Sequence, residues 1–221
     1  MSCDATPVKD SLDHVLWIGG ATDAGKTSIA KALSQKYATR AYHLDAYDSE
    51  EPPGHWSRTD PVRHPNMYAA PTRDRDWMWV NTTPDQLVER WLSWAPERFQ
   101  LVIEDLLALP VRPRVIADGY SFTPDLVAPL LSSPRQALWL ISTEEFKRAS
   151  YERRGKGAFT DTSDASRARA NHIGRDLLLA EQFRDRAEKL GLRVVDVDGS
   201  RTLDEITAVV ESHFAPLLNR V

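Results

Sequence analysis

The chain has 221 residues, which is long enough for one α/β domain with a substantial apolar core but short for two independent domains. Its 28 Lys and Arg against 32 Asp and Glu give a formal net charge of −4, which disfavours a general attraction to nucleic acid or to acidic membranes. Because it has one cysteine, no signal-like N-terminus and no apolar run of membrane-spanning length, we expect a cytoplasmic protein.

The N-terminal segment has the order strand, loop, helix that a phosphate-binding loop requires. Residues 14–18 form a short apolar run suited to a buried strand, and a helical pattern begins at Ser28. The intervening sequence GATDAGKT fits the pattern G-x-x-x-x-G-K-[ST] at every fixed position. In such a loop, backbone N–H groups surround phosphate oxygens, the lysine adds a positive charge and the next hydroxyl ligates Mg²⁺. We therefore expect a nucleotide to be bound by Gly20, Thr22, Asp23, Ala24, Gly25, Lys26, Thr27 and Ser28.

A second strand is expected at residues 40–44, followed by an irregular segment. Residues 46–81 are rich in Pro, His, Arg, Trp and Tyr without a clear period, which indicates loops or short helices inserted beyond the strand ends. We interpret this segment as a substrate-binding insert, whose arginines suit an acidic group and whose tryptophans suit a ring. Trp77 and Trp79 fit a small local core better. The expected substrate contacts are Asp48, Trp56, Arg58 and Arg63, with Tyr120 from farther along the chain.

The remainder of the chain alternates helices and strands. Thr83, Pro84 and Gln86 form a helix start with a capping box, and the helix should run to Leu109 with an interruption near Pro96. Further elements are expected as strands at 114–117, 136–141 and 191–197 and as helices at about 164–190 and 200–214. This order predicts a single α/β domain over residues 1–221, with three layers, a doubly wound parallel sheet of about five strands and helices on both faces. Its ligand crevice should lie at the carboxyl ends of the strands.

A basic stretch precedes the long helix. Between Lys147 and Arg193 there are 12 Lys or Arg and 7 Asp or Glu, although the chain as a whole is acidic. Residues 148–170 therefore suggest a lid region that closes over polyphosphate, because arginine binds phosphate oxygens with two donors at once. We expect Arg153 and Arg154 to contact phosphate, with Arg148, Arg169 and Arg175 as second choices.

Carboxylates fall at the predicted strand ends, close to the glycine-rich loop. Asp118 ends an apolar run and is expected to hold Mg²⁺ with Thr27, directly or through water; the alternative is a capped turn at Asp118-Gly119. Asp45 ends the second strand and is expected to accept the proton of an acceptor hydroxyl. Asp48 is the substitute base, or else supports the Mg²⁺ from outside its ligand shell.

These segments together resemble the P-loop small-molecule kinases of the nucleoside-monophosphate-kinase-like group. The resemblance rests on Gly20 to Ser28, His43-Leu44-Asp45, the 115–119 segment, the Arg153-Arg154 pair and the loop after the final strand. It covers the core and lid but not the insert. It implies that Gly199 and Ser200 lie beside adenine. The combination of the loop with a strand-end Asp is also similar to chloramphenicol phosphotransferases, and the group includes nucleoside, gluconate and shikimate kinases.

The leading hypothesis is an ATP- and Mg²⁺-dependent kinase that phosphorylates a hydroxyl of a metabolite, a nucleoside-like compound or an antibiotic, with Asp45, Lys26, Arg153 and Arg154 as its catalytic residues. A Tyr-Ser-Phe sequence follows Asp118-Gly119 where adenylate kinases have Pro-Arg, which argues against a nucleoside monophosphate acceptor. Two alternatives remain: a nucleotide-dependent switch or binding protein without phosphotransfer, and a polynucleotide 5'-kinase, which the net charge disfavours. A homodimer is compatible with the sequence.

Overall fold

The computed structural model describes residues 9–49, 54–70, 74–154 and 159–218. Its centre is one all-parallel sheet with the strand order β2-β3-β1-β4-β5. The strands are β1 (Val15–Gly20), β2 (Arg40–His43), β3 (Val115–Asp118), β4 (Ala137–Ser142) and β5 (Arg193–Val197). The expected α/β class and the number of parallel strands are confirmed.

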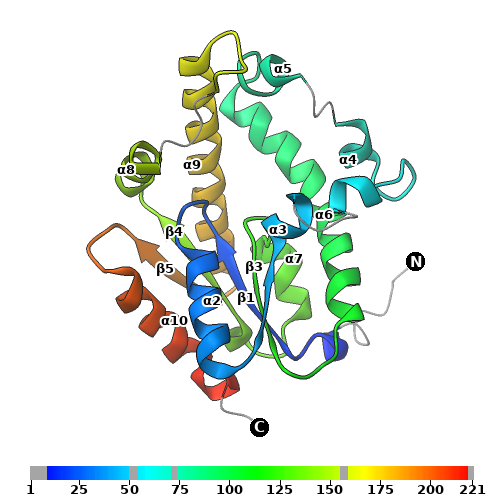
Figure 1. Cartoon of the computed structure of the whole chain (residues 1–221), viewed down its shortest axis with the longest axis vertical. Helices are drawn as coiled ribbons and strands as arrows, with labels where there is room; N and C mark the ends of the chain where they lie inside the picture. The colour runs from blue at the N-terminus through cyan, green and yellow to red at the C-terminus, as the bar shows by residue number, and fades with distance from the viewer. Residues whose placement is uncertain (1–8, 50–53, 71–73, 155–158, 219–221) are drawn as a thin grey trace.

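Helices cover both faces of the sheet (Figure 1). One face packs on α2 (Lys26–Tyr37) and α10 (Leu203–Leu218), and the other on α6 (Pro84–Ala108), α7 (Pro124–Val127) and α9 (Ala165–Lys189). The central strand shows why: Leu16 and Ile18 belong to the first core, whereas Val15 and Trp17 belong to the second. Because successive side chains of a strand point to opposite faces, a strand that is apolar throughout needs a helical layer on each side.

The insert consists of short helices. Its described parts are α3 (Leu44–Ser49), the 3-10 turn η1 (His55–Arg58), α4 (Pro65–Ala69) and α5 (Arg75–Trp79). A carboxylate of α6 holds α4 in place, because buried Glu97 accepts hydrogen bonds from the backbone N–H groups of Asn66 at 3.0 Å and Met67 at 2.8 Å. The expected short helices are confirmed here, and residues 50–53 and 71–73 of the insert lie outside the described residues.

Helix α6 corrects one expectation, because it continues through Pro96 without interruption. An interior proline removes one backbone hydrogen bond, but buried Trp91, Ala95 and Phe99 pack on the sheet on either side of it. Burial of this stripe offsets the missing bond and keeps the helix in one piece. The predicted helix start is confirmed, with the Thr83–Gln86 capping box and Pro84 in the first turn.

The remaining elements lie close to their expected positions. Helix α9 is capped by Asp164, and α10 begins at Leu203 rather than at residue 200 because Thr202, just before it, forms a capping box with Glu205 of its first turn. Part of the expected lid region is helix α8 (Glu144–Arg154), and residues 155–158 lie outside the described residues. Short 3-10 turns, η2 (Ala128–Leu130) and η3 (Pro134–Gln136), precede β4. Among the described residues, no helix has the length and apolar character needed to cross a bilayer.

Candidate active site

The glycine-rich loop, residues 20–27, joins β1 to α2 with an unusual backbone. Gly20, Asp23 and Gly25 have φ angles of 112°, 64° and 85°, all in the left-handed region. A Cβ on Gly20 would lie 2.1 Å from the carbonyl oxygen of Leu140, so only glycine fits there. Gly25 precedes α2 and gives that helix no side-chain cap. The first N–H groups of α2 are therefore left to an anion, such as a phosphate, or to water.

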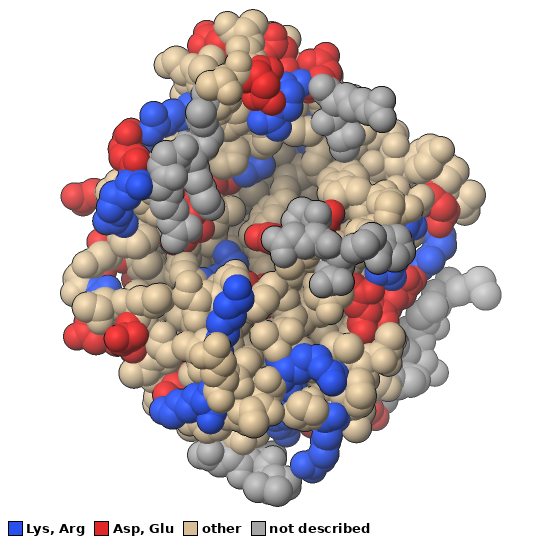
Figure 2. Space-filling model, in the orientation of Figure 1, with Lys and Arg blue, Asp and Glu red and all other residues tan. Residues whose placement is uncertain are grey.

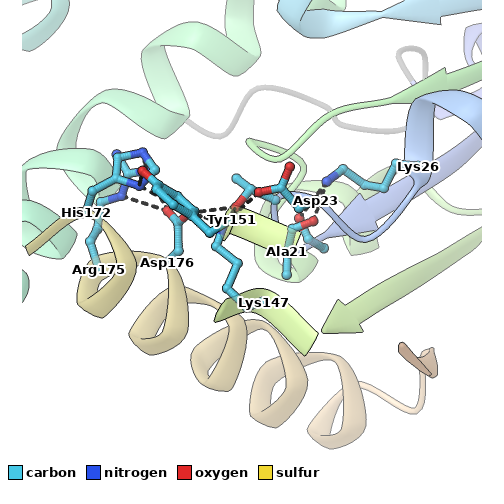
Figure 3. Close-up of polar contacts among 10 residues, drawn as sticks. Ala21, Asp23, Lys26, Lys147, Tyr151, His172, Arg175 and Asp176 are labelled. Atoms are coloured by element: carbon cyan, nitrogen blue, oxygen red, sulfur yellow. Dashed lines mark hydrogen bonds and ion pairs between the residues drawn. The ribbon is translucent and has the colours of Figure 1, made fainter. Parts of the chain in front are cut away.

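Lys26 turns its side chain back over this loop. Its Nζ donates to the carbonyl oxygens of Ala21 at 2.6 Å and Gly20 at 3.1 Å, and the residue is 8 % exposed (Figure 3). Burial lowers the pKa of Lys26, while the carboxylates of Asp45 and Asp118 act against that shift. The ammonium group thus lies within the field of two carboxylates at the mouth of the loop.

The side chains of Thr27 and Asp118 are hydrogen-bonded to each other. The Thr27 hydroxyl donates to Asp118 Oδ2 at 2.7 Å, and His43 Nδ1 contacts the other carboxylate oxygen. The sheet register brings these residues together. Asp118 is aligned with His43 of β2 and with Ile18 near the end of β1, the strand that leads into the loop.

This pair fits Mg²⁺ with a bound polyphosphate better than a metal site made only of protein. Within the described ranges, no group of three or more His, Cys, Asp and Glu side chains could hold a metal ion. Mg²⁺ commonly uses one or two protein oxygens, and phosphates and water complete its shell. Thr27 and Asp118 supply such oxygens.

A cavity of about 400 Å³ opens above the loop. Figure 2 shows this face of the molecule hollowed near its centre. The cavity is lined by five residues outside the loop and by six residues within it or just after it, namely Asp45, Trp79, Tyr120, His172 and Arg175 together with Thr22, Asp23, Gly25, Lys26, Thr27 and Ser28. Asp45 is in the first turn of α3, its side chain is 70 % exposed, and one of its oxygens lies 3.6 Å from Arg98. The structure therefore brings Asp45, Lys26, Thr27 and Tyr120 to one cavity.

Helix α9 forms the wall opposite the loop. Arg175 donates to Asp176 at 2.5 Å and lies 3.2 Å from His172 Nε2. Burial and then the charge of Arg175 lower the pKa of His172 to about 4, so its imidazole is neutral at pH 7. Tyr151 from α8 lies 3.0 Å from His172 Nδ1, and burial raises the pKa of Tyr151 to about 12. This wall presents a neutral ring and a guanidinium that already has a carboxylate partner.

The structure places the expected insert contacts elsewhere, against α6. Arg58 pairs with Asp105 at 2.5 Å and with Glu104 at 3.1 Å, and Arg63 pairs with Glu104. Asp48 contacts Arg98 and lies 2.9 Å from His55 Nδ1.

The two aromatic residues expected to contact the acceptor, Trp56 and Tyr120, lie in different places. Trp56 packs edge-on against Trp94 of α6 with 5.6 Å between ring centroids. Tyr120 lines the cavity, whereas Asp48, Trp56, Arg58 and Arg63 do not.

The expected lid arginines have partners on α8 itself. Arg148 pairs with Glu144 at 2.7 Å, and Arg153 lies over the Phe146 ring at 5.6 Å from its centroid. The side chain of Arg154 lies outside the described residues. Among the second choices, Arg169 contacts Glu152 and Arg175 lines the cavity.

The loop after β5 lies next to the same helix. A Cβ on Gly199 would lie 3.1 Å from Phe146, the ring that Arg153 covers. Ser200 donates its hydroxyl to Asp198 at 2.6 Å. Gly199 and Ser200 are therefore near α8 but outside the cavity lining.

Sequence reasoning missed Lys147 and Asp176, which lie behind the loop. Asp176 is a charged residue on the buried face of α9. The same face continues with the apolar residues Leu179, Ala180 and Phe183. Lys147 is in the first turn of α8, the helix that follows β4. It therefore lies beyond the carboxyl ends of the strands, as Asp118 does at the end of β3. A charge on a buried helical stripe was the available signal for Asp176, because such a charge needs a partner.

No model of a known protein family matches the chain, and no curated protein matches it.

Proposed function

We propose that this protein is a P-loop kinase that transfers the γ-phosphoryl group of ATP to a hydroxyl of a small molecule. The observation that carries this proposal is that Lys26, Thr27 and Asp45 line one cavity of about 400 Å³, with Asp118 hydrogen-bonded to Thr27 beside it. Phosphoryl transfer depends mainly on positioning and on charge neutralisation, so this small set of groups is chemically sufficient.

The donor side is the glycine-rich loop. The uncapped N-terminus of α2 and the loop N–H groups would bind the phosphates, and Lys26 would exchange its carbonyl partners for phosphate oxygens. Thr27 and Asp118 would hold Mg²⁺, which neutralises phosphate charge when bound. His43, on the far oxygen of Asp118, would fix the orientation of that carboxylate.

Asp45 is the proposed base. Its carboxylate would accept the hydroxyl proton as the acceptor oxygen bonds to the γ-phosphorus and the bond to the ADP oxygen breaks. Arg98, 3.6 Å from Asp45 and in contact with Asp48, would restrict where the base points.

The remaining walls favour an uncharged ring as the acceptor. Trp79 and Tyr120 offer aromatic surface, and His172 is neutral at pH 7. The cation at this end, Arg175, already pairs with Asp176 at 2.5 Å. An acidic acceptor would therefore find little uncompensated positive charge on this side of the cavity.

The test is transfer from γ-labelled ATP with Mg²⁺ to a library of nucleosides, sugars, hydroxy acids and antibiotics. Three proteins are compared: wild type, Asp45→Asn, and Asp185→Asn as a control on the exposed side of α9. We expect labelled product from wild type and control, and a kcat lower by about 10²- to 10⁴-fold in Asp45→Asn, the range of a general base. Its affinity for ATP should stay within about threefold of wild type, because binding and proton transfer use different groups.

Two results would contradict the proposal in different ways. Tight ATP binding by wild type with no product from any acceptor would favour a nucleotide-dependent switch. Undiminished turnover in Asp45→Asn would remove Asp45 from the mechanism. The described residues on the face in Figure 2 show acidic and basic side chains interspersed rather than one continuous basic track, so a polynucleotide acceptor gains no support from this face.

A further inference from the structure

Lys147 is a buried lysine that the proposed transfer reaction does not use. It is 1 % exposed, and its side chain extends from α8 toward the glycine-rich loop (Figure 3). Its Nζ lies 2.6 Å from Asp176 Oδ2 and 3.0 Å from Asp23 Oδ2, and it also donates to the Thr22 hydroxyl. Thr22 in turn donates to Asp176 at 2.6 Å. One ammonium group thus joins three segments that are distant in the sequence.

The charges of this network balance. Lys147 and Arg175 supply two cations, and Asp23 and Asp176 supply two carboxylates. Burial alone would raise the pKa of Asp176, but Arg175, His172 and Lys147 outweigh burial and lower it. A buried ion that loses one partner is costly, so every member of this set depends on the others.

Asp23 is the unexpected member, because it places a carboxylate inside a loop whose proposed ligand is a polyphosphate. It lines the cavity, and its backbone has φ 64°, a conformation that Asp adopts more readily than most residues other than glycine. Left uncompensated, its negative charge would repel phosphate oxygens at short range. Lys147 removes that repulsion, and it also holds the Thr22–Asp23 part of the loop against α8 and α9.

We propose that Lys147 is a positioning residue of the nucleotide site, which neutralises Asp23 and fixes the loop in the shape that accepts a polyphosphate. This inference rests on the proposed nucleotide binding, but not on the transfer of a phosphoryl group. It makes the loop depend on a residue more than 100 positions later in the chain. The sequence pattern of the loop alone gives no sign of that dependence.

The test compares two double variants of equal net charge, Lys147→Met with Asp23→Asn and Lys147→Met with Asp176→Asn. Both lose the ammonium group and one carboxylate, but only the second keeps the carboxylate in the loop. The probe is MgATP, with its dissociation constant measured by calorimetry, and urea unfolding reports whether each variant is folded. Lys31→Met, an exposed lysine of α2, serves as the control for the lysine substitution.

We expect Lys31→Met and the variant that lacks Asp23 to bind MgATP within about fivefold of wild type. The variant that keeps Asp23 should bind about 30-fold more weakly or worse, the scale of an uncompensated buried charge. Because Asp176→Asn also removes the partner of Arg175, the affinities are compared under conditions in which urea unfolding shows both double variants to be fully folded. Equal affinities in both would overturn the inference.

The outcomes also separate this inference from the proposed function. Wild-type protein that binds no MgATP would overturn both. The expected difference in affinity without any phosphoryl transfer would overturn the kinase proposal and leave the role of Lys147 standing. Phosphoryl transfer by wild type, together with equal affinities in the two double variants, would support the kinase proposal and overturn the role of Lys147.

Discussion

The two sides of the cavity use charged residues in opposite ways. On the loop side, Lys26, Thr27 and Asp45 lie on the cavity wall, where a ligand would meet them. In the insert, Arg58 and Arg63 do not line the cavity and instead pair with carboxylates of α6. Charge in a segment therefore says little about ligand binding until its protein partners are known.

A partly buried polar hub centred on Asp105 of α6 joins η1 of the insert to the sheet and to α6. Asp105 accepts hydrogen bonds from Tyr42 at 2.8 Å and from Arg58 at 2.5 Å, and lies 2.7 Å from His55 Nε2. Burial alone would raise the pKa of Asp105, but the hydrogen bonds from His55, Arg58 and Tyr42 outweigh burial and lower it. Such a network stabilises only when all its members are satisfied.

The largest expected effect is on stability, and it tests whether the polar hub around Asp105 stabilises the fold. Asp105→Asn replaces an ionic acceptor of three donors, and we expect the free energy of unfolding to fall by about 3 kcal/mol, as for other broken buried pairs. Asp125→Asn is the matched control, because its pair with Arg186 is about half exposed and should be worth less than about 1 kcal/mol. Urea denaturation measures both. Equal losses in the two variants would show that the hub contributes no more than a surface pair.

A smaller effect should appear at His172, on the α9 wall of the cavity. The unfolded imidazole takes up a proton near pH 6.5, but the folded one does so only near pH 4, because burial and then Arg175 disfavour its charged form. The unfolded state therefore binds more protons in this interval, and stability falls as the pH falls from about 6.5 to about 4.

His172→Gln should reduce that loss by on the order of 2 kcal/mol between pH 7 and pH 4. The measurement is the free energy of unfolding in urea at several pH values for both proteins. Some slope should remain, because burial also lowers the pKa of His14 and His213. Parallel curves for wild type and variant would show that His172 is not held neutral by the fold.

The smallest expected effect concerns Arg63. Its pair with Glu104 is substantially exposed, so Arg63→Met should change the free energy of unfolding by less than about 0.5 kcal/mol. It should also leave the KM for the acceptor unchanged, because Arg63 does not line the cavity. Tyr120→Leu, on the cavity wall, should raise that KM. A raised KM in Arg63→Met would move the acceptor toward the insert and break the contrast between the two sides.

The elements of the core could be predicted because their signals are local. Apolar runs of four to six residues gave the strands, and capping residues such as Thr83 gave helix starts. The predicted interruption at Pro96 was wrong because α6 is kept continuous by packing against the sheet. That packing involves residues of several other elements, which the local sequence does not reveal.

The candidate site divides in the same way. The loop and the carboxylates at the strand ends follow from strand order and from a contiguous motif, so that Asp45, Thr27 and Asp118 could be named. The partners of Arg58 and Lys147 could not, because Asp105 and Asp176 lie on helices whose orientation is set only when the chain packs.

Helix α6 has a consequence for how this protein could change its specificity. Its 25 residues span about 37 Å, and along that length it carries Glu97 under α4, Arg98 beside Asp45, and a stripe buried on the sheet. The insert thus contacts the same helix that packs on the sheet. Variation in ligand preference would more readily come from replacing single side chains on the cavity wall, such as Trp79 or Tyr120, than from swinging the insert as a unit.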